Sequence, residues 1–123
     1  MASILVVTGP NQGDYFPLGH RVIVVGRDEG CPIQIVDERV SRKHVQIRFD
    51  HTDDRYHALD MKSGNGTFVN DQRLAEAVTL ADGDVIAIGG SELMFLAVDF
   101  PDRETAFEHY RKRGERTKST VIR

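Results

Sequence analysis

The sequence predicts a single all-β domain, a sandwich of short strands. The apolar segments are short and rich in valine and isoleucine, which favour strands. Clusters of glycine, proline, asparagine and aspartate separate them at close intervals, as turns do. A helical pattern begins only after residue 100. The length of 123 residues suits one domain, and 40% hydrophobic with 28% charged residues is ordinary for a folded soluble protein.

The first half of the chain contains six candidate strands. They are residues 3–8, 15–18, 22–25, 33–36, 45–49 and 55–60, with turn clusters at 9–14 and 51–54. Residues 22–25 are a continuous β-branched run, which predicts a strand buried on both faces or nearly so. Residues 45–49 alternate apolar and polar side chains, the pattern of a half-buried strand, and residues 55–60 complete a hairpin with them.

The second half adds strands at residues 78–80 and 84–88 and a long buried strand at 91–98. Asn65-Gly66 is a strong turn signal, and it predicts a plain hairpin within residues 62–70. Residues 102–113 are expected to form a helix, because acids come early and bases late. Its apolar stripe would be Ala106, Phe107 and Tyr110, with Gly114 ending it.

Charge is distributed unevenly along the chain. Residues 111–123 contain six bases and one acid, so they carry +5, and the net charge of −3 leaves −8 for the other residues. An acidic body argues against a general nucleic-acid binder. Cys31 is the single cysteine, which excludes an internal disulfide and favours a cytoplasmic location. No segment approaches the ~20 apolar residues of a membrane span, and we expect no signal peptide.

The segment from Arg39 to Lys43 has the most distinctive chemistry. Four bases and no acid lie between Arg39 and Arg48, and Ser41 stands between two of the arginines. Guanidinium groups donate to two oxygens at once and a hydroxyl donates a further bond, so the segment suits an anion. A loop held between strands keeps such donors in place. We therefore expect it to bind a phosphate carried by another polypeptide.

Three separated segments together resemble the signature of the forkhead-associated (FHA) domain. They are Gly26-Arg27, Ser41-Arg42-Lys43-His44 and residues 63–70, and residues 80–86 are also similar to a strand pair of that family. The resemblance covers about residues 3–99 and leaves residues 100–123 as a C-terminal helix and a flexible basic tail. It implies an eleven-stranded β-sandwich whose loops at one end bind phosphothreonine peptides, without catalysis and without a cofactor.

The resemblance also assigns roles by position. Arg27 and Ser41 would bond the phosphate, Arg42 would add charge near it or contact the peptide, and Asn65 would bond the peptide backbone. Arg39 lies where the family often reads the third residue after the phosphothreonine, and an arginine there implies a preference for an acidic residue.

Four further residues would be architectural: Gly26, His44, Gly66 and Asn70. Gly64 departs from the family, which often has threonine or serine there. Its lack of a hydroxyl implies weaker phosphate binding, or a substitute role for the Gly64 amide.

Catalysis and metal binding are weaker interpretations of the same sequence. A triad of Ser41, His44 and Asp60 lacks the Gly-x-Ser-x-Gly elbow of many serine hydrolases. The five histidines have no paired-ligand spacing and one cysteine cannot build a structural zinc site, so no metal site is expected.

The tail offers two candidate phosphosites, Thr117 and Thr120, in a segment that resembles phosphorylatable tails beside some small bacterial FHA domains. A phosphorylated tail could dock in its own pocket or a neighbour's, giving a switch or self-association. A solvated terminus is the simpler interpretation. The expected partner is a phosphothreonine protein, either a Ser/Thr kinase or its substrate, and not a membrane. The alternative is a scaffold whose basic tail contacts nucleic acid or acidic proteins independently of phosphate.

Overall fold

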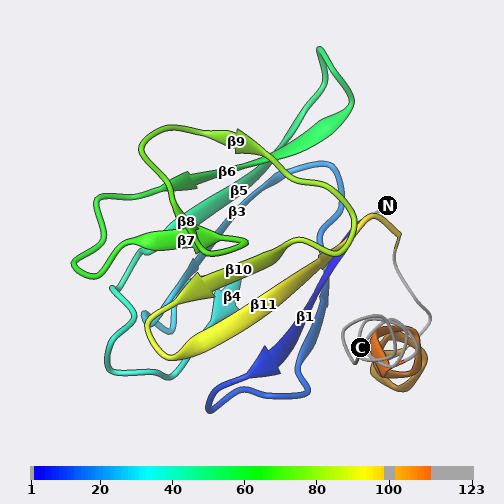
Figure 1. The fold of residues 1–123 in the computed structure, drawn as a ribbon, viewed down its shortest axis with the longest axis horizontal. Coiled ribbons are helices and arrows are strands. Elements are labelled where there is room, and N and C mark those ends of the chain that lie inside the picture. The colour runs from blue at the N-terminus through cyan, green and yellow to red at the C-terminus, as the bar shows by residue number, and fades with distance from the viewer. Residues whose placement is uncertain (1, 99–101, 112–123) are drawn as a thin grey trace, which may run out of the picture.

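The chain folds into two packed β-sheets, as a computed structural model that describes residues 2–98 and 102–111 shows (Figure 1). The six-stranded sheet has the order β2 (Tyr15–Pro17), β1 (Ser3–Thr8), β11 (Ser91–Leu96), β10 (Val85–Ile88), β7 (Thr67–Val69) and β8 (Gln72–Arg73). The five-stranded sheet has the order β4 (Ile33–Gln34), β3 (Val22–Gly26), β5 (Val45–Asp50), β6 (Arg55–Asp60) and β9 (Val78–Thr79). The prediction of an eleven-stranded sandwich with a short C-terminal helix is confirmed.

The main core lies between the two sheets. Strand β5 shows how the sequence builds it, because Val45 and Ile47 point inward and Gln46 and Arg48 do not. Ile47 pairs with Ile23 on one side and with Ala58 on the other, and all three are almost fully buried. Burying each large aliphatic side chain stabilises the fold by about 1.5–3 kcal/mol, so this alternation fixes the strand register.

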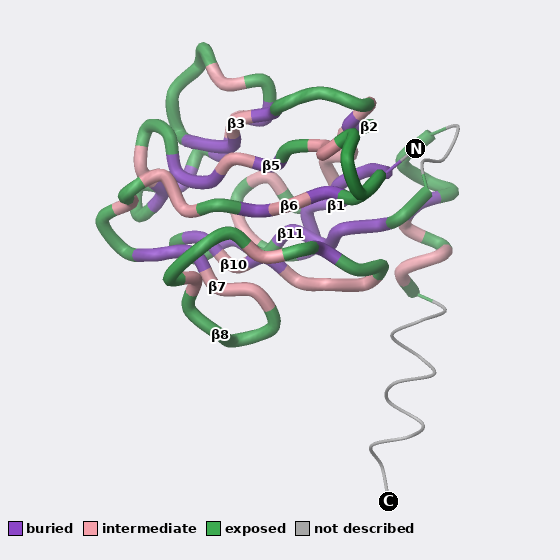
Figure 2. The backbone as a smooth tube through the Cα atoms, turned by 90° about the horizontal axis from the view of Figure 1, so that it is seen from above, coloured by how far each residue is buried: buried purple, intermediate pink, exposed green. Residues whose placement is uncertain are grey.

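The helix of residues 103–111 covers the part of the outer face of the six-stranded sheet formed by β1 and β11 (Figure 2). A second apolar cluster joins Leu5 of β1 and Leu96 of β11 to Ala106, with Phe107 and Tyr110 packed at its edge. The predicted helical stripe is therefore confirmed, and it explains why β1 and β11 are buried on both faces. No helix among the described residues is long and apolar enough to cross a membrane.

The five-stranded sheet differs from the sequence prediction, because no described segment forms a helix over its outer face. Residues 22–25 were expected to be buried on both faces, but Val22 is 55% exposed while Ile23 and Val25 are buried. The prediction was wrong because a β-branched run suits a strand whether one face or both are covered. The strand expected at residues 33–36 is also shorter, ending at Gln34.

The hairpin expected at Asn65-Gly66 does not form, since β6 and β7 belong to different sheets. Residues 61–66 instead cross from one sheet to the other. The tight hairpin turn lies at Asn70 and Asp71, which have φ angles of 49° and 69° and connect β7 to β8. Strand β8 was missed in the sequence because both of its residues are exposed and polar.

Candidate functional site

The loop that follows β4 is pinned along the end of β3 by backbone hydrogen bonds. The Arg27 amide donates to the Ser41 carbonyl at 3.0 Å, and the His44 amide donates to the Val25 carbonyl at 2.9 Å. Gly26 makes this close approach possible, since a Cβ at that position would lie 2.0 Å from the Arg42 carbonyl oxygen. These backbone hydrogen bonds therefore fix the position of the loop that contains the residues expected to bind phosphate.

His44 joins this loop to residues 63–66. Its fully buried ring accepts a hydrogen bond from the Ser41 amide at Nδ1 (3.0 Å) and contacts the Gly66 carbonyl through Nε2 (2.8 Å). A carbonyl only accepts, so Nε2 carries the proton and the ring is the neutral tautomer that donates there. Both ring nitrogens are thus used to connect the two loops.

This geometry opposes the triad weighed from the sequence. The hydroxyl of Ser41 is not bonded to His44, because both ring nitrogens are occupied by backbone groups. Asp60 accepts hydrogen bonds from the hydroxyls of Ser63 and Thr67 rather than from the imidazole. A nucleophile that no base contacts is not activated in the way acyl-transfer enzymes require.

Ser41 Oγ accepts a hydrogen bond from the Gly64 amide at 3.0 Å. With one lone pair used in this way, the hydroxyl hydrogen is free to point toward a ligand. The Gly64 amide therefore already has a partner and orients Ser41, rather than replacing the missing hydroxyl. A Cβ on Gly64 would meet only Ser41 Oγ, at an ordinary 3.9 Å, so a serine or threonine would fit there.

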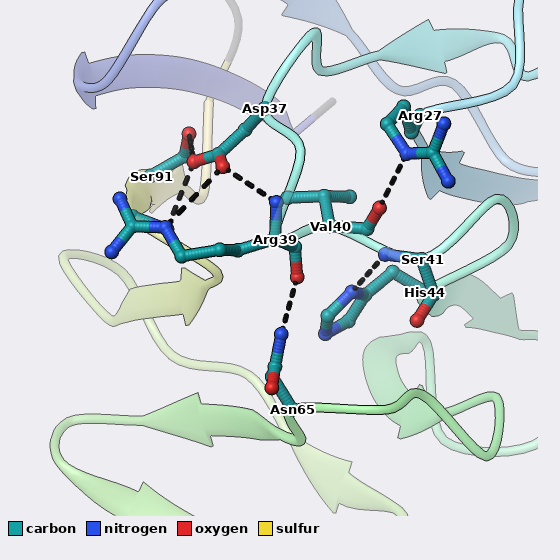
Figure 3. A network of polar contacts seen from close by, with 9 residues as sticks. Arg27, Asp37, Arg39, Val40, Ser41, His44, Asn65 and Ser91 are labelled. Atoms are coloured by element: carbon teal, nitrogen blue, oxygen red, sulfur yellow. Dashed lines mark hydrogen bonds and ion pairs between the residues drawn. The ribbon is translucent and has the colours of Figure 1, made fainter.

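Arg39 and Asn65 lie on the other side of Ser41 (Figure 3). The Asn65 side-chain amide donates to the Arg39 carbonyl at 2.9 Å, which leaves its second N–H and its oxygen for other partners. The Arg39 guanidinium lies against the turn at Gly90, and Asp37 accepts from the Arg39 amide at 2.9 Å. Asp37 also accepts from the Gly90 amide (2.8 Å) and the Ser91 hydroxyl (3.1 Å).

Arg27 projects beside Ser41 and is exposed (Figure 3). Its Nε donates to the Val40 carbonyl at 2.9 Å, which fixes the plane of the guanidinium and leaves both terminal nitrogens without a partner among the described residues. The Arg42 amide likewise has no partner in the described part of the chain. These contacts bring Arg27, Ser41 and Asn65 to one end of the sandwich, each with at least one donor that has no partner among the described residues.

Of the other residues singled out in the sequence, Arg42 and Gly64 lie in the same loops and are exposed. Gly66 has a φ of +83° and supplies the carbonyl that His44 binds. Asn70 lies away from this end: its side chain donates to Asp84 (2.9 Å) and accepts from the Val85 amide (3.0 Å), joining β7 to β10. Thr117 and Thr120 are outside the described residues.

Two carboxylates anchor the loops of the site, the buried Asp37 and the half-buried Asp60, and neither role was expected from the sequence. Burial alone would raise the pKa of Asp37, but bonds from the Arg39 and Gly90 amides and the Ser91 hydroxyl outweigh it and hold the pKa below its usual range. Burial likewise raises the pKa of Asp60, but hydrogen bonds from Ser63 and Thr67 outweigh it and lower the pKa below its usual range. An aspartate two residues before Arg39 is an Asx-turn signal, which could have identified Asp37.

We predict that Asp60→Asn destabilises the protein at pH 7 and that the difference from wild type shrinks below about pH 4. The unfolded carboxyl titrates near 3.9, whereas the folded one titrates lower, so the unfolded state binds more protons in between. The contribution of Asp60 is therefore complete above about pH 4 and lost as the pH falls through the folded pKa. Urea unfolding of both proteins between pH 7 and pH 2.5 measures this, and a difference independent of pH would contradict it.

Cys31 and one group of potential metal ligands lie elsewhere. Burial and the charge of Asp28 raise the pKa of the Cys31 thiol, so the thiol is not activated as a nucleophile. Asp50, Asp53 and His57 come together at the tip of the β5–β6 hairpin, at the opposite end of β5 from His44. The 2.9 Å contact between His57 Nε2 and Asp53 has ordinary hydrogen-bond geometry.

A family model described as the FHA domain matches residues 23–89, more than half of the chain. The glycogen accumulation regulator GarA of Mycobacterium tuberculosis is 37% identical over 95 residues, covering 77% of this chain and 57% of GarA. An oxoglutarate dehydrogenase inhibitor of Corynebacterium jeikeium is 38% identical over 95 residues, covering 77% of this chain and 64% of that protein. The chain thus spans less than two thirds of the length of these relatives.

The fold has solved counterparts. One is an FHA domain from a structural and functional analysis of phosphothreonine-dependent FHA domain interactions. It superposes with a TM-score of 0.70 at 29% identity and covers 80% of this chain and 98% of its own. The residues matched by the family model, 23–89, include Arg27, Ser41 and Asn65.

Proposed function

Because the chain belongs to the FHA domain family, we propose that it is a non-catalytic module that binds phosphothreonine-containing polypeptides at the end of the sandwich formed by Arg27, Ser41 and Asn65. The observation that carries this proposal is the set of unused donors there. Two terminal nitrogens of Arg27, the Ser41 hydroxyl hydrogen and the Arg42 amide have no partner among the described residues, while the groups that hold them are fully bonded.

The energetics favour a phosphate ester as the ligand. A phosphothreonine carries about −1.5 to −2 charge and three acceptor oxygens, matching several donors around one point. Charge-assisted hydrogen bonds contribute on the order of 1.5–3 kcal/mol each, so two or three of them, less the cost of ordering, give micromolar affinity, roughly −8 kcal/mol. A glutamate is a poor substitute, because it has half the charge and a planar head.

The remaining residues complete the proposed peptide contacts. Asn65 would bond the peptide backbone beside the phosphothreonine with its free N–H and oxygen. Arg39, which Asp37 holds in place, would face an acidic residue three positions after it. Arg42 would add charge, and Gly64 would act by orienting Ser41.

The relatives indicate a regulatory role. The two proteins above are named for regulating glycogen accumulation and inhibiting oxoglutarate dehydrogenase. We propose that this chain is likewise a regulator in Ser/Thr-kinase signalling, with a phosphorylated kinase or kinase substrate as its partner, in the cytoplasm. The binding unit would be residues 3–99, since the following helix packs on the outer face of the six-stranded sheet.

A phosphothreonine-oriented peptide library tests this proposal. The full chain should enrich phosphothreonine peptides over the same sequences with phosphoserine and with unmodified threonine. The Ser/Thr distinction matters because a purely electrostatic surface would bind both phosphates alike. Equal capture of the three libraries would reject phosphothreonine recognition.

A further inference from the structure

Arg73 is an exposed cation beside the site, and it has no part in the proposed contacts with the phosphothreonine. It lies on β8, opposite Phe68 of β7, and the Leu74 amide donates to the Thr67 carbonyl at 2.9 Å to extend that pairing. The hairpin therefore brings the side chain of Arg73 next to Gly66, the residue that follows Asn65.

The guanidinium of Arg73 rests against the backbone of Gly66. A Cβ on Gly66 would lie 2.9 Å from Arg73 Nε, 3.0 Å from Cζ and 3.2 Å from Nη2, so the missing side chain makes room for the cation. Gly66 is itself fixed, because its carbonyl contacts His44 and its amide donates to the Ser63 hydroxyl at 3.0 Å. The cation thus rests on one of the most firmly held parts of the site.

Arg73 also has no carboxylate to neutralise it. Among the described residues its side chain makes no ion pair and no hydrogen bond. An arginine presents five N–H donors in a planar fork that matches a carboxylate, and here none of the five has a partner among the described residues. The chain has a net charge of −3, yet this cation beside the proposed phosphate site has no acidic partner among the described residues. It is therefore available to bind an acidic group of a ligand.

The strand order places Arg73 and Arg39 on opposite sides of Asn65. Ile88 of β10 pairs with Thr67 of β7, so the Gly89-Gly90 turn, against which Arg39 lies, continues beside Gly66 and Asn65. Strand β8 is on the far side of β7 (Figure 1). Adjacent strands are about 4.8 Å apart, so β10 and β8 are about 10 Å apart, the length of about three residues of an extended peptide.

From this arrangement we propose that Arg73 is a specificity-determining residue that binds a second acidic side chain of the phosphothreonine peptide, at a position different from the one that Arg39 faces. This inference rests on the proposed function. It specifies the ligand further: a phosphothreonine flanked by two acidic residues, each facing its own arginine across Asn65.

A positional aspartate scan tests the proposal with the full chain. The parent probe is a phosphothreonine peptide with alanine at every flanking position, and each further peptide replaces one alanine by aspartate. Dissociation constants are measured for wild type, Arg73→Gln, Arg39→Gln and Arg55→Gln, and each is divided by that variant's value for the parent. Arg55 is an exposed arginine at the opposite end of the sandwich and serves as the matched control.

Wild type and Arg55→Gln should prefer aspartate at two positions by about 2- to 5-fold each, the size expected of an exposed ion pair. Arg73→Gln should lose one preference and keep the parent affinity, while Arg39→Gln should lose the other. If Arg73→Gln keeps both preferences, or wild type shows only one, the inference is overturned and the proposed function stands. If wild type does not bind the parent peptide, both the inference and the proposed function are rejected. Equal melting temperatures confirm that the exposed substitutions leave the fold intact.

Discussion

Arg27→Ala is expected to weaken the binding of a phosphothreonine peptide about 100-fold. The two terminal nitrogens of this guanidinium are held beside Ser41 by the bond from Nε to the Val40 carbonyl. Two charge-assisted hydrogen bonds to phosphate, at about 1.5–3 kcal/mol each, amount to at least ~3 kcal/mol, or two factors of ten in affinity. The fold should lose little, because the residue is exposed and its side chain makes this one hydrogen bond within the described chain.

Two controls separate the loss of the ligand contact from other effects. Arg27→Lys keeps the charge but removes the fork, so it should recover only part of the affinity. Arg55→Ala removes another exposed arginine, at the opposite end of the sandwich, and should bind as wild type does. Isothermal titration with one phosphopeptide measures all four proteins. An Arg27→Ala protein that binds no more weakly than Arg55→Ala would contradict both this prediction and the proposed site.

The parts of the fold that follow from local pattern could be predicted from the sequence. The β5–β6 hairpin was predicted correctly, because the alternating side chains of the strands and the polar turn between them are both local features of the sequence. The helix stripe is correct for the same reason, since Ala106, Phe107 and Tyr110 share one face. Neither inference required knowing which segment packs on which.

Errors arose where the outcome depends on distant segments. The exposure of Val22 depends on whether anything covers the five-stranded sheet, which no local pattern states. Asn65-Gly66 is a turn signal, but whether the chain reverses or crosses to the other sheet depends on the partners of β7. The role of Asp37 is only partly local, because its bond from the Arg39 amide is an Asx turn, whereas its partners Gly90 and Ser91 reach it only once the sandwich has formed.

Gly26 also depends on a distant segment, because the backbone of Arg42 leaves no room for a side chain at this position. Gly26→Ala is expected to destabilise the protein by about 3 kcal/mol or more and to abolish phosphopeptide binding. The new Cβ would lie 2.0 Å from the Arg42 carbonyl oxygen and 2.7 Å from its carbon, and both are backbone atoms that no rotamer change can move. To accommodate it, residues 41–44 must shift, which breaks the bonds from the Arg27 amide to Ser41 and from the His44 amide to Val25.

Gly30→Ala provides the matched control, because it adds the same methyl group to a nearby glycine of the loop that follows β3. Its Cβ would meet only a side-chain oxygen of Asp28, at 3.7 Å, and Gly30 does not have a positive φ. Its effect should therefore stay within about 0.5 kcal/mol. Urea unfolding at pH 7 compares the two variants with wild type. Equal stabilities for Gly26→Ala and Gly30→Ala would show that the loop moves away at little cost, in which case the donors of Ser41 and Arg27 are not held in advance and the affinity of the site needs another source.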